Sequence, residues 1–484
     1  MSQFNIIENK LKTITRGSII PHPGKIYGGD ARKNSFRFFK KNVKFILYIA
    51  ALHRLSFNKN GVIYVLNKDN GFPDYFDNQN LDLKYDLDIA ARKEHSFKWV
   101  EEELRDYFSD DTKVLVLAPS INTNLDNLGE IIYNFLNIYE NSIIFATSDL
   151  IHYGSNFDTE NLLKYPQQQD KIKKENRLIY NLKNVKLKNV KSIIAKHDYI
   201  CCGPKALILF CIVAKKMKWI GKVTDYYDSH GKMKSQLLDR YTIDYKNVDN
   251  LVSYVSMIYG KYNDFNPLIE FDILQGIGLS KSIIMRNTIF NDDSIYKINL
   301  PVWSLLRSKN RNNGIFVGTE FFDKEKKIFN TNCSYGRFED GETSISNKII
   351  RASNDCNGDA KNRWNIPYEK KNLNMMTYKL ELLDEKKNWK KYKAKDVYKY
   401  FKLNGRYGML LKIPPTKYNN NWTSATFLPV VARDYKSIWE ISDYMENLSE
   451  KQGKNKNDWK LDGSEILIYK SGSYIWKLHK LIFK

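Results

Sequence analysis

Short runs of apolar residues recur through the first half of the chain, and polar stretches with helical spacing separate them. Continuous apolar runs are typical of strands that are buried on both faces of a parallel sheet. The first half therefore predicts an α/β domain with a mostly parallel central sheet flanked by helices. The predicted strands lie at Ser18–Ile20, Val43–His53, Val114–Ala118, Ser142–Gly154, Lys222–Tyr227 and Leu251–Tyr259, and the predicted helices at Ser35–Asn42, Trp99–Leu104, Leu125–Tyr139 and Gln167–Lys191.

The pattern changes after about Tyr262, where the apolar runs become shorter and glycine and asparagine more frequent. This change predicts a second domain of α+β type over residues 263–484, after a first domain over residues 1–262. No Gly-x-Ser-x-Gly, phosphate loop or zinc-spaced cysteine pair occurs in the second half. Its predicted helices are Phe271–Ile289, Thr343–Ser353 and Lys395–Phe401, and its predicted strands are Val302–Leu306 paired with Ile315–Thr319, Met375–Leu383 and Tyr407–Ile413.

Composition supports a packed protein, because 42% of the 484 residues are hydrophobic. The formal net charge is +22, which attracts polyanions at low salt. The basic residues are scattered in short pairs rather than gathered in a stripe, so we expect a solvated basic surface and no specific nucleic-acid partner. No apolar run is long enough to span a membrane, and no secretory signal is evident.

The five cysteines are too few and too unevenly spaced to form a disulfide framework in a chain of this length. We therefore expect a reducing, cytoplasmic compartment.

Titratable side chains stand where several predicted strands end. Pro21 and Pro23 stop the first strand on either side of His22, the second strand ends at His53, and Asp149 and His152 close the fourth. Ligands of α/β sheets gather at the carboxyl ends of the strands, so these groups are expected at one edge.

Two further groups stand near predicted helix starts. His95 lies near the start of one helix and could point back toward the strand ends, and Cys202 precedes an apolar helix. A helix amino-terminus lowers the pKa of a thiol and favours the metal-binding thiolate. Two imidazoles and one thiolate, from His22, His53 and Cys202, are a suitable ligand set for a transition metal. Taken singly, each of these residues is equally compatible with a structural role.

Five segments, in order, resemble the Memo family over nearly all of residues 16–262. They are Pro21-His22-Pro23-Gly24-Lys-Ile-Tyr27-Gly28-Gly29, the strand that ends in His53, Glu94-His95-Ser96, Ser148-Asp149-Leu-Ile-His152-Tyr153-Gly154 and Cys202-Gly203. The family usually has Gly-Pro-Ser-His-His at the second segment, where an ungapped alignment places Leu52 opposite the ligand and a shift of one residue places His53 there.

The resemblance implies a fold similar to the class III extradiol dioxygenases. It also implies one metal ion, iron or copper with zinc as a third option, held by His22, His53 and Cys202. Asp149, His152 and His95 would then be the catalytic candidates.

The second half resembles the AMMECR-type domain, which is commonly encoded with Memo and radical-SAM proteins in the AmmeMemoRadiSam system. The resemblance implies proteins of that system as partners. The hallmark Leu-Arg-Gly-Cys-Ile-Gly-Thr is reduced to Asn312-Asn-Gly314-Ile-Phe-Val-Gly318-Thr319 without its cysteine, so we expect a structural turn there. The matching segments are Gly405-Arg-Tyr-Gly408-Met-Leu-Leu411, Ser424-Ala-Thr-Phe-Leu-Pro429-Val-Val-Ala432 and, more weakly, Asp359-Ala-Lys-Asn-Arg363-Trp364.

Two main interpretations follow for function. In the first, the protein is a metal-binding, redox or dioxygenase-like enzyme that acts on a small molecule or a protein side chain. In the second, the metal pocket is vestigial and the strand-end cleft docks peptides or proteins. The distance of His53 and Cys202 from His22 discriminates between them, because three ligands of one ion must converge.

Overall fold

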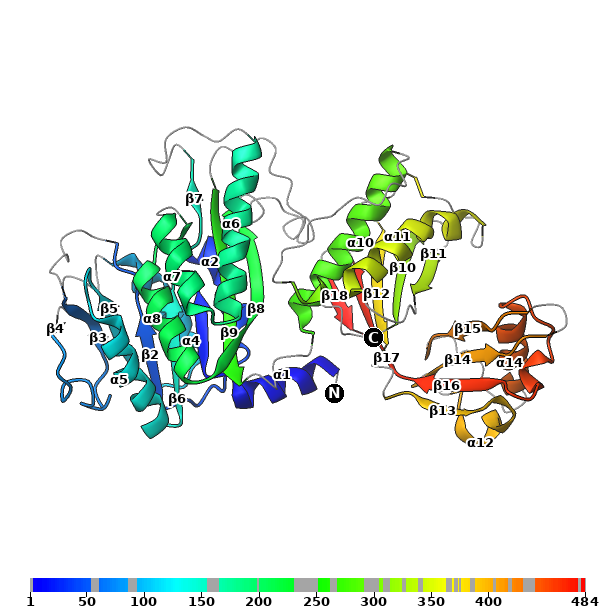
Figure 1. The fold of residues 1–484 in the computed structure, drawn as a ribbon, viewed down its shortest axis with the longest axis horizontal. Coiled ribbons are helices and arrows are strands. Elements are labelled where there is room, and N and C mark those ends of the chain that lie inside the picture. Colours follow the sequence, from blue (N-terminus) through cyan, green and yellow to red (C-terminus); the bar gives the residue numbers. More distant parts are fainter. Residues whose placement is uncertain are drawn as a thin grey trace. The chain divides into compact units, whose positions relative to one another are not determined.

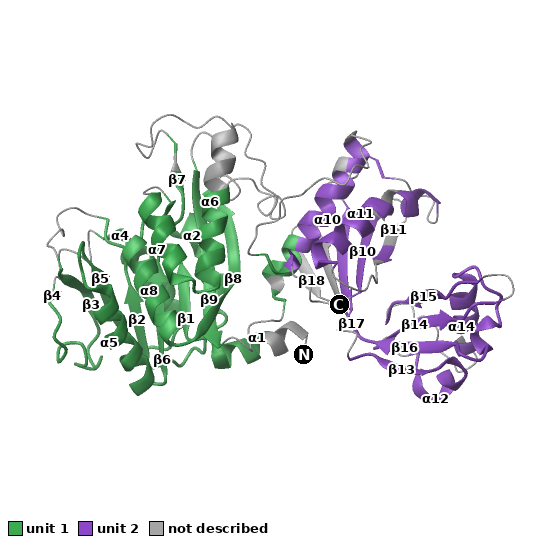
Figure 2. Ribbon diagram, in the orientation of Figure 1, with its two compact units in different colours: residues 1–275, 299–305 green, residues 276–298, 306–484 purple. Residues whose placement is uncertain are grey.

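The computed structural model forms two compact units, residues 1–275 with 299–305 and residues 276–298 with 306–484 (Figure 2). No helix within the described ranges combines the length and apolarity that crossing a membrane requires. The structure describes residues 3–53, 61–85, 94–154, 165–197, 200–229, 251–261, 268–290, 304–307, 314–323, 328–337, 343–362, 368–369, 373, 376–383, 388–403, 406–416, 420–429, 440–477 and 480–483.

A nine-stranded sheet forms the centre of the first unit (Figure 1). Its middle strands pair in parallel in the order β5 (Lys113–Pro119), β2 (Phe45–Ile49), β6 (Ser142–Thr147) and β1 (Gly17–Ile20). The carboxyl ends of these four strands therefore lie at one edge of the sheet.

The sheet is mostly parallel, as predicted, and antiparallel pairs occur toward both of its margins. On one side β3 (Ile63–Lys68) runs antiparallel to β5 and pairs in parallel with the edge strand β4 (Leu83–Tyr85). On the other side β9 (Leu251–Lys261) runs antiparallel to β1 and pairs with β7 (His152–Tyr153) and β8 (Trp219–Asp228).

Helices cover both faces of this sheet, which confirms the predicted α/β class (Figure 1). One layer contains α5 (Leu125–Ile138), α6 (Tyr165–Lys183), α7 (Leu187–Lys196) and α8 (Pro204–Lys216). The other contains α2 (Lys25–Phe36) and α4 (His95–Tyr107), and α1 (Gln3–Ile14) precedes β1. The apolar runs of the central strands form one buried hydrophobic core.

One predicted helix of the first unit is wrong. Residues Ser35–Asn42 do not form a helix, because α2 ends at Phe36. Phe36, Phe38 and Phe39 are all buried, which a surface helix with a single apolar face does not allow. The strand β3 is missing from the predicted elements, although its residues are an apolar run of the same kind.

The second unit contains helices and two antiparallel sheets, as its α+β pattern predicts. The first sheet has the order β11 (Ile328–Arg337), β10 (Ile315–Asp323), β12 (Thr377–Leu383), β17 (Ser471–Lys477) and β18 (Lys480–Phe483). The helices α10 (Glu270–Phe290) and α11 (Ile345–Asn362) belong to this half of the chain, and α11 packs on β10 and β11.

The second sheet has the order β13 (Lys390–Lys393), β16 (Glu465–Tyr469), β14 (Gly408–Ile413) and β15 (Thr423–Phe427). The helix α14 (Glu440–Glu450) packs on β14 and β15, and α12 (Val397–Tyr400) contacts β13. Tyr444, Met445 and Leu448 of α14 are buried in the hydrophobic cluster of this sheet.

Two expectations for the second half are wrong. Leu305–Arg307 form a short 3-10 helix instead of a strand, and β10 pairs with β11 and β12. Gly318 and Thr319 lie inside β10 rather than in a turn, where the Thr319 hydroxyl is 2.7 Å from that of Tyr368. Cys356 on α11 is disulfide-bonded. The turn expected between the two paired strands, Asn310–Gly314, lies outside the described residues except for Gly314.

Candidate metal centre

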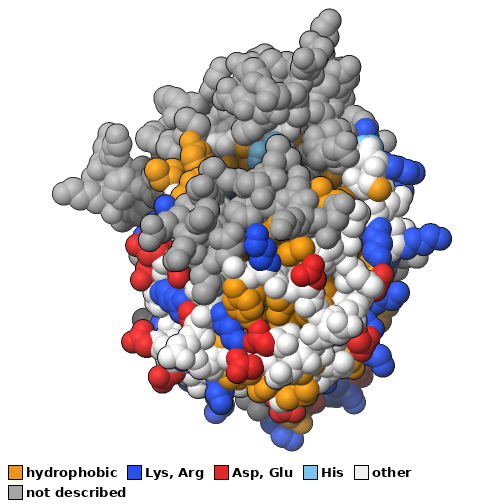
Figure 3. All heavy atoms as spheres, turned by 90° about the vertical axis from the view of Figure 1, so that its left-hand side faces the viewer, with side chains coloured by type: hydrophobic (Ala, Val, Ile, Leu, Met, Phe, Trp, Pro, Cys, Tyr) orange, Lys and Arg blue, Asp and Glu red, His pale blue; other side chains and the backbone are white. Residues whose placement is uncertain are grey.

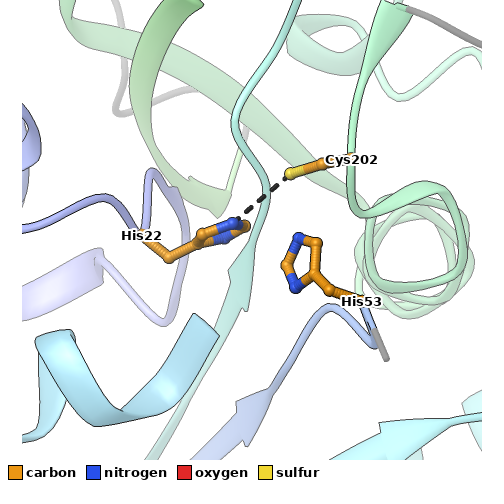
Figure 4. A group of neighbouring side chains, drawn as sticks. All are labelled: His22, His53 and Cys202. Carbon is orange, nitrogen blue, oxygen red and sulfur yellow. Dashed lines mark hydrogen bonds between the residues drawn. The ribbon is translucent and has the colours of Figure 1, made fainter. Parts of the chain in front are cut away.

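Three side chains from distant parts of the chain converge at the carboxyl edge of the central sheet (Figure 4). His22 follows β1, His53 follows β2, and Cys202 stands just before α8. One ligand atom from each lies within 4.8 Å of the other two. The structure therefore brings together the three residues that the sequence singled out as ligands.

Both ring nitrogens of His22 face polar groups in a buried site. Nδ1 is 2.9 Å from the hydroxyl of Thr147 at the end of β6, and Nε2 is 3.4 Å from Sγ of Cys202. The backbone N–H of His22 donates to Oδ1 of Asp149 at 3.0 Å. These contacts fix the ring so that Nε2 is the atom available to an ion shared with Cys202.

Glu94 fixes His53 through two hydrogen bonds. Oε2 of Glu94 accepts the backbone N–H of His53 at 2.9 Å, and Oε1 lies 2.8 Å from its Nδ1. Since an ionised carboxylate only accepts, Nδ1 carries the proton and Nε2 has the lone pair. Nε2 of His53 is buried and has no hydrogen-bond partner among the described residues.

The first turn of α4 holds the chain after β2 in place. The Ser96 hydroxyl donates to the carbonyl of Ala51 at 2.7 Å, and the Tyr48 hydroxyl donates to the carbonyl of Ser96 at 2.6 Å. Glu94 also caps α4 by accepting the N–H of Ser96 at 3.1 Å. The predicted strand end at His53 is thus a short loop after Ile49.

The neighbouring residue Leu52 packs against the hydrophobic core. His53, one residue later, has its ring centroid 4.8 Å from that of His22. The one-residue shift in the resemblance therefore corresponds to the geometry of the folded chain.

Cys202 lies against the loop that follows β6. Its Sγ accepts the backbone N–H of Asp149 at 3.2 Å, and the next N–H, of Gly203, donates to the Ser148 hydroxyl at 3.0 Å. A Cβ at position 203 would lie 2.5 Å from the Thr147 carbonyl oxygen, which only glycine avoids. The Cys-Gly pair before α8 is thus needed for the close approach of two segments.

Burial dominates the electrostatics of the site. It lowers the pKa of His22 well below its ordinary value, an effect that His53, His95 and His152 reinforce. It raises the pKa of the Cys202 thiol well above its ordinary value, with Asp149 and Cys201 adding to it. The expected lowering of the thiol pKa at a helix start is therefore wrong, because burial outweighs the helix.

Asp149 lies beside both His22 and Cys202. Burial raises the pKa of its carboxyl to about 7, although the backbone N–H of His22 opposes the shift. Its Oδ2 is 3.7 Å from Nε2 of His22. The carboxyl can therefore exchange a proton near neutral pH next to the candidate ligands.

His152 and His95 lie near this group. Nδ1 of His152 is 2.8 Å from the carbonyl oxygen of Leu150, and burial lowers its pKa. The ring of His95 stacks on that of His53 with centroids 4.3 Å apart, and its centroid is 5.1 Å from that of Trp99. Figure 3 shows histidine atoms at the surface beside hydrophobic side chains on one face of the molecule.

A second group of potential ligands shares His53. It consists of His53, Glu94 and His95, whose ligand atoms also lie within 4.8 Å of one another. Because the Glu94 carboxylate already accepts two hydrogen bonds from His53, its geometry fits an orienting partner of His53 better than a metal ligand.

A buried ion pair supports the loop that carries His22. The guanidinium of Arg32 donates to both carboxylate oxygens of Glu103, at 2.7 and 2.8 Å. Its Nη1 donates to the carbonyls of Pro21 and Pro23, at 3.2 and 2.7 Å. Sequence reasoning missed this pair, and it also missed Thr147 and the role of Glu94.

Comparison with known proteins gives one family and two similar structures. Residues 2–258, just over half of the chain, match the family model described as Memo-like protein. None of the curated proteins compared with the chain matches it. The chain is similar to the uncharacterised protein PH0010 from Pyrococcus horikoshii at 12% identity and a TM-score of 0.33, over 43% of this chain and 94% of that one. It is also similar to the uncharacterised protein JW3007 from Escherichia coli K12 at 9% identity and a TM-score of 0.31, over 50% of this chain and 99% of that one.

Proposed function

The chain belongs to the Memo-like protein family, and we propose that it holds one transition metal ion through His22, His53 and Cys202 for metal-dependent chemistry. The observation that carries the proposal is the buried Nε2 of His53. It has no hydrogen-bond partner in the described part of the chain and belongs to the group of three ligand atoms within 4.8 Å of one another. A buried imidazole nitrogen without a partner is unfavourable unless a ligand or ion satisfies it.

The donor set fits such an ion. Imidazole nitrogen suits iron, copper and zinc, and a thiolate shifts the preference toward copper and zinc. Glu94 and Thr147 hold the Nδ1 atoms of His53 and His22, which is how outer groups orient metal-binding imidazoles. The Cys202 thiol, protonated in its buried site, would release its proton when the ion binds.

A bound ion of this kind would supply Lewis acidity and, as iron or copper, a redox centre. The chain's own contribution is to position groups and move protons. Asp149, with a pKa of about 7, can hold or release a proton 3.7 Å from His22. His152 and His95 line the same group and would orient a small molecule or a protein side chain.

Metal analysis of the purified full chain tests the proposal. We expect one iron, copper or zinc ion per chain after reconstitution, and loss of that ion in His22→Ala and Cys202→Ala. The matched controls are His197→Ala and Cys211→Ala, which remove an imidazole and a thiol outside the group. Unchanged stoichiometry in both site variants would refute the proposal.

The second candidate function is a binding module that docks peptides or proteins in the strand-end cleft without a metal. Such a module does not require three ligands to converge, and in this structure they do. The geometry therefore favours the metal centre. Peptide binding that persists in a chain unable to take up metal would favour the module.

We also propose the finer relationships that the sequence resemblance implies. The first unit would be similar in fold to class III extradiol dioxygenases, and residues 263–484 would form an AMMECR-type domain that works with radical-SAM system proteins. In support, the two segments with the best AMMECR-type match form the adjacent strands β14 and β15, with Leu410 opposite Thr426. Solving the excised second domain experimentally would test this relationship.

A further inference from the structure

A cavity of about 260 Å³ opens beside two of the proposed metal ligands, His53 and Cys202. Its walls come from the residues that follow β2, from the end of β5, and from the first turn of α8. Since β2 and β5 are parallel neighbours, their carboxyl ends bring both walls to the same edge of the sheet as the metal ligands. The cavity is therefore placed to hold a molecule against the proposed ion.

Most of the lining is apolar. Ala50, Ala51 and Leu52 form the wall after β2, and Pro119 and Ile121 line the side of β5. Ile121 is 48% exposed, so the cavity reaches the protein surface there. A dry cavity of roughly 150 Å³ accommodates benzene, so this volume suits a molecule with one substituted ring or a short branched chain.

Among the described residues that line the cavity, Lys205 is the one charged side chain apart from the proposed ligands. Lys205 is half-buried at the second position of α8 and makes no ion pair with a described residue. No Asp or Glu is among the described residues that line the cavity. An anionic group on a ligand in the cavity would pair with this cation through a charge-assisted hydrogen bond.

We propose that this cavity binds a small, largely apolar molecule with one carboxylate group, which pairs with Lys205. The apolar body then lies along Ala50, Ala51 and Ile121, next to His53 and Cys202. A single ammonium matches a single negative charge, which favours a carboxylate over the doubly charged phosphate. The inference rests on the proposed function, because it makes this molecule the substrate class of the metal centre.

Isothermal titration of the zinc-reconstituted full chain with benzoate and with neutral benzamide tests the inference. We expect benzoate to bind at least about tenfold more tightly than benzamide, since a charge-assisted hydrogen bond contributes that much. Lys205→Gln should abolish the preference for benzoate over benzamide. Ile121→Glu should weaken the binding of benzoate through like-charge repulsion. Lys215→Gln, at the far end of the same helix, is the matched control and should leave both affinities unchanged.

Zinc content, measured on the same samples, separates the two hypotheses. Equal binding of benzoate and benzamide, no binding of benzoate, or a preference that survives in Lys205→Gln would overturn the inference even with zinc fully bound. Absence of zinc would overturn the proposed function instead. Normal zinc content in Lys205→Gln shows that the variant is folded at the site.

Discussion

The carboxylate of Glu94 holds His53 at two points, accepting its backbone N–H at 2.9 Å and lying 2.8 Å from its Nδ1. Burial alone would raise the pKa of Glu94, but these hydrogen bonds and that of Ser96 lower it below its ordinary value. The carboxylate is thus ionised at neutral pH and directs Nε2 of His53 away from itself, toward His22 and Cys202.

Glu94→Gln should weaken metal binding without abolishing folding. The amide has only one acceptor oxygen and cannot accept hydrogen bonds from both the backbone N–H and the Nδ1–H of His53. The orientation of His53 therefore becomes less defined. Loss of such an orienting partner typically lowers metal affinity about 10- to 100-fold. Competition with a chromophoric chelator would measure the change. Glu102→Gln, on the exposed side of α4, should keep the wild-type affinity, and equal affinities in both variants would argue against this role of Glu94.

Arg32→Met should destabilise the protein strongly. It leaves the buried Glu103 carboxylate and the carbonyls of Pro21 and Pro23 without their donor, and removing one partner of a buried ion pair costs about 3–5 kcal/mol. The control Arg105→Met breaks a similar pair with Asp69, in which the arginine is 40% exposed, and should cost no more than about 1 kcal/mol. Urea unfolding measures the free energy of unfolding of both variants. Similar losses in Arg32→Met and Arg105→Met would contradict a larger contribution of the buried pair to stability.

Gly203→Ala should perturb both stability and the metal centre. The new Cβ would lie 2.5 Å from the Thr147 carbonyl and 3.0 Å from Cβ of Ser148, and overpacking of this kind costs about 1–3 kcal/mol. Because Thr147 contacts His22, metal affinity should fall as well. Gly358→Ala, where nothing lies within 4 Å inside helix α11, should instead stabilise the protein by up to about 1 kcal/mol. If Gly203→Ala changes neither the free energy of unfolding nor the metal affinity, the segments that contain Gly203 and Thr147 can move apart to accommodate the new Cβ.

The buried Glu175 should give the stability a specific pH dependence. Its carboxylate accepts the N–H of Ile151 at 3.2 Å and the hydroxyl of Tyr226 at 2.6 Å, and burial raises its pKa to about 7. The folded state therefore keeps a proton that the unfolded chain releases near pH 4.5. This contribution is fully present below about pH 4.5 and is lost as the pH rises through about 7.

Urea unfolding at several pH values checks this dependence. Relative to Glu175→Gln, the wild type should lose up to about 1.4 kcal/mol of unfolding free energy per pH unit within that window. Tyr226→Phe removes a hydrogen bond that lowers the pKa of Glu175. The unfolding free energy of this variant should therefore continue to decline to higher pH than that of the wild type. Parallel profiles for wild type and Glu175→Gln would contradict the assignment.

Much of the first unit follows from local sequence. The apolar runs that form β1, β5 and β6 are buried on both faces, so their sequences identify strands without further information. Proline on both sides of His22 marks a strand end, and parallel pairing brings Asp149 to the same edge. The local pattern of strand ends and helix starts therefore indicates that His22, Asp149 and Cys202 share one edge, and the resemblance to the Memo family adds that they belong to one site.

The remaining features depend on contacts between distant residues. Arg32 and Glu103 are 71 residues apart, and nothing in either segment indicates that they pair. Thr147 and Glu94 gain their roles only when β6 and α4 pack beside the strand ends. The predicted direction of the Cys202 pKa shift is wrong, because the local helix start is visible in the sequence and the burial is not.

X-ray absorption fine structure at the zinc edge of the reconstituted protein tests the central claim most directly, because it reports the ligand atoms themselves. We expect one sulfur at about 2.3 Å and two imidazole nitrogens at about 2.0–2.1 Å, with the sulfur lost in Cys202→Ser. A shell without sulfur, or an unchanged shell in Cys202→Ser, would contradict the claim that His22, His53 and Cys202 share one ion.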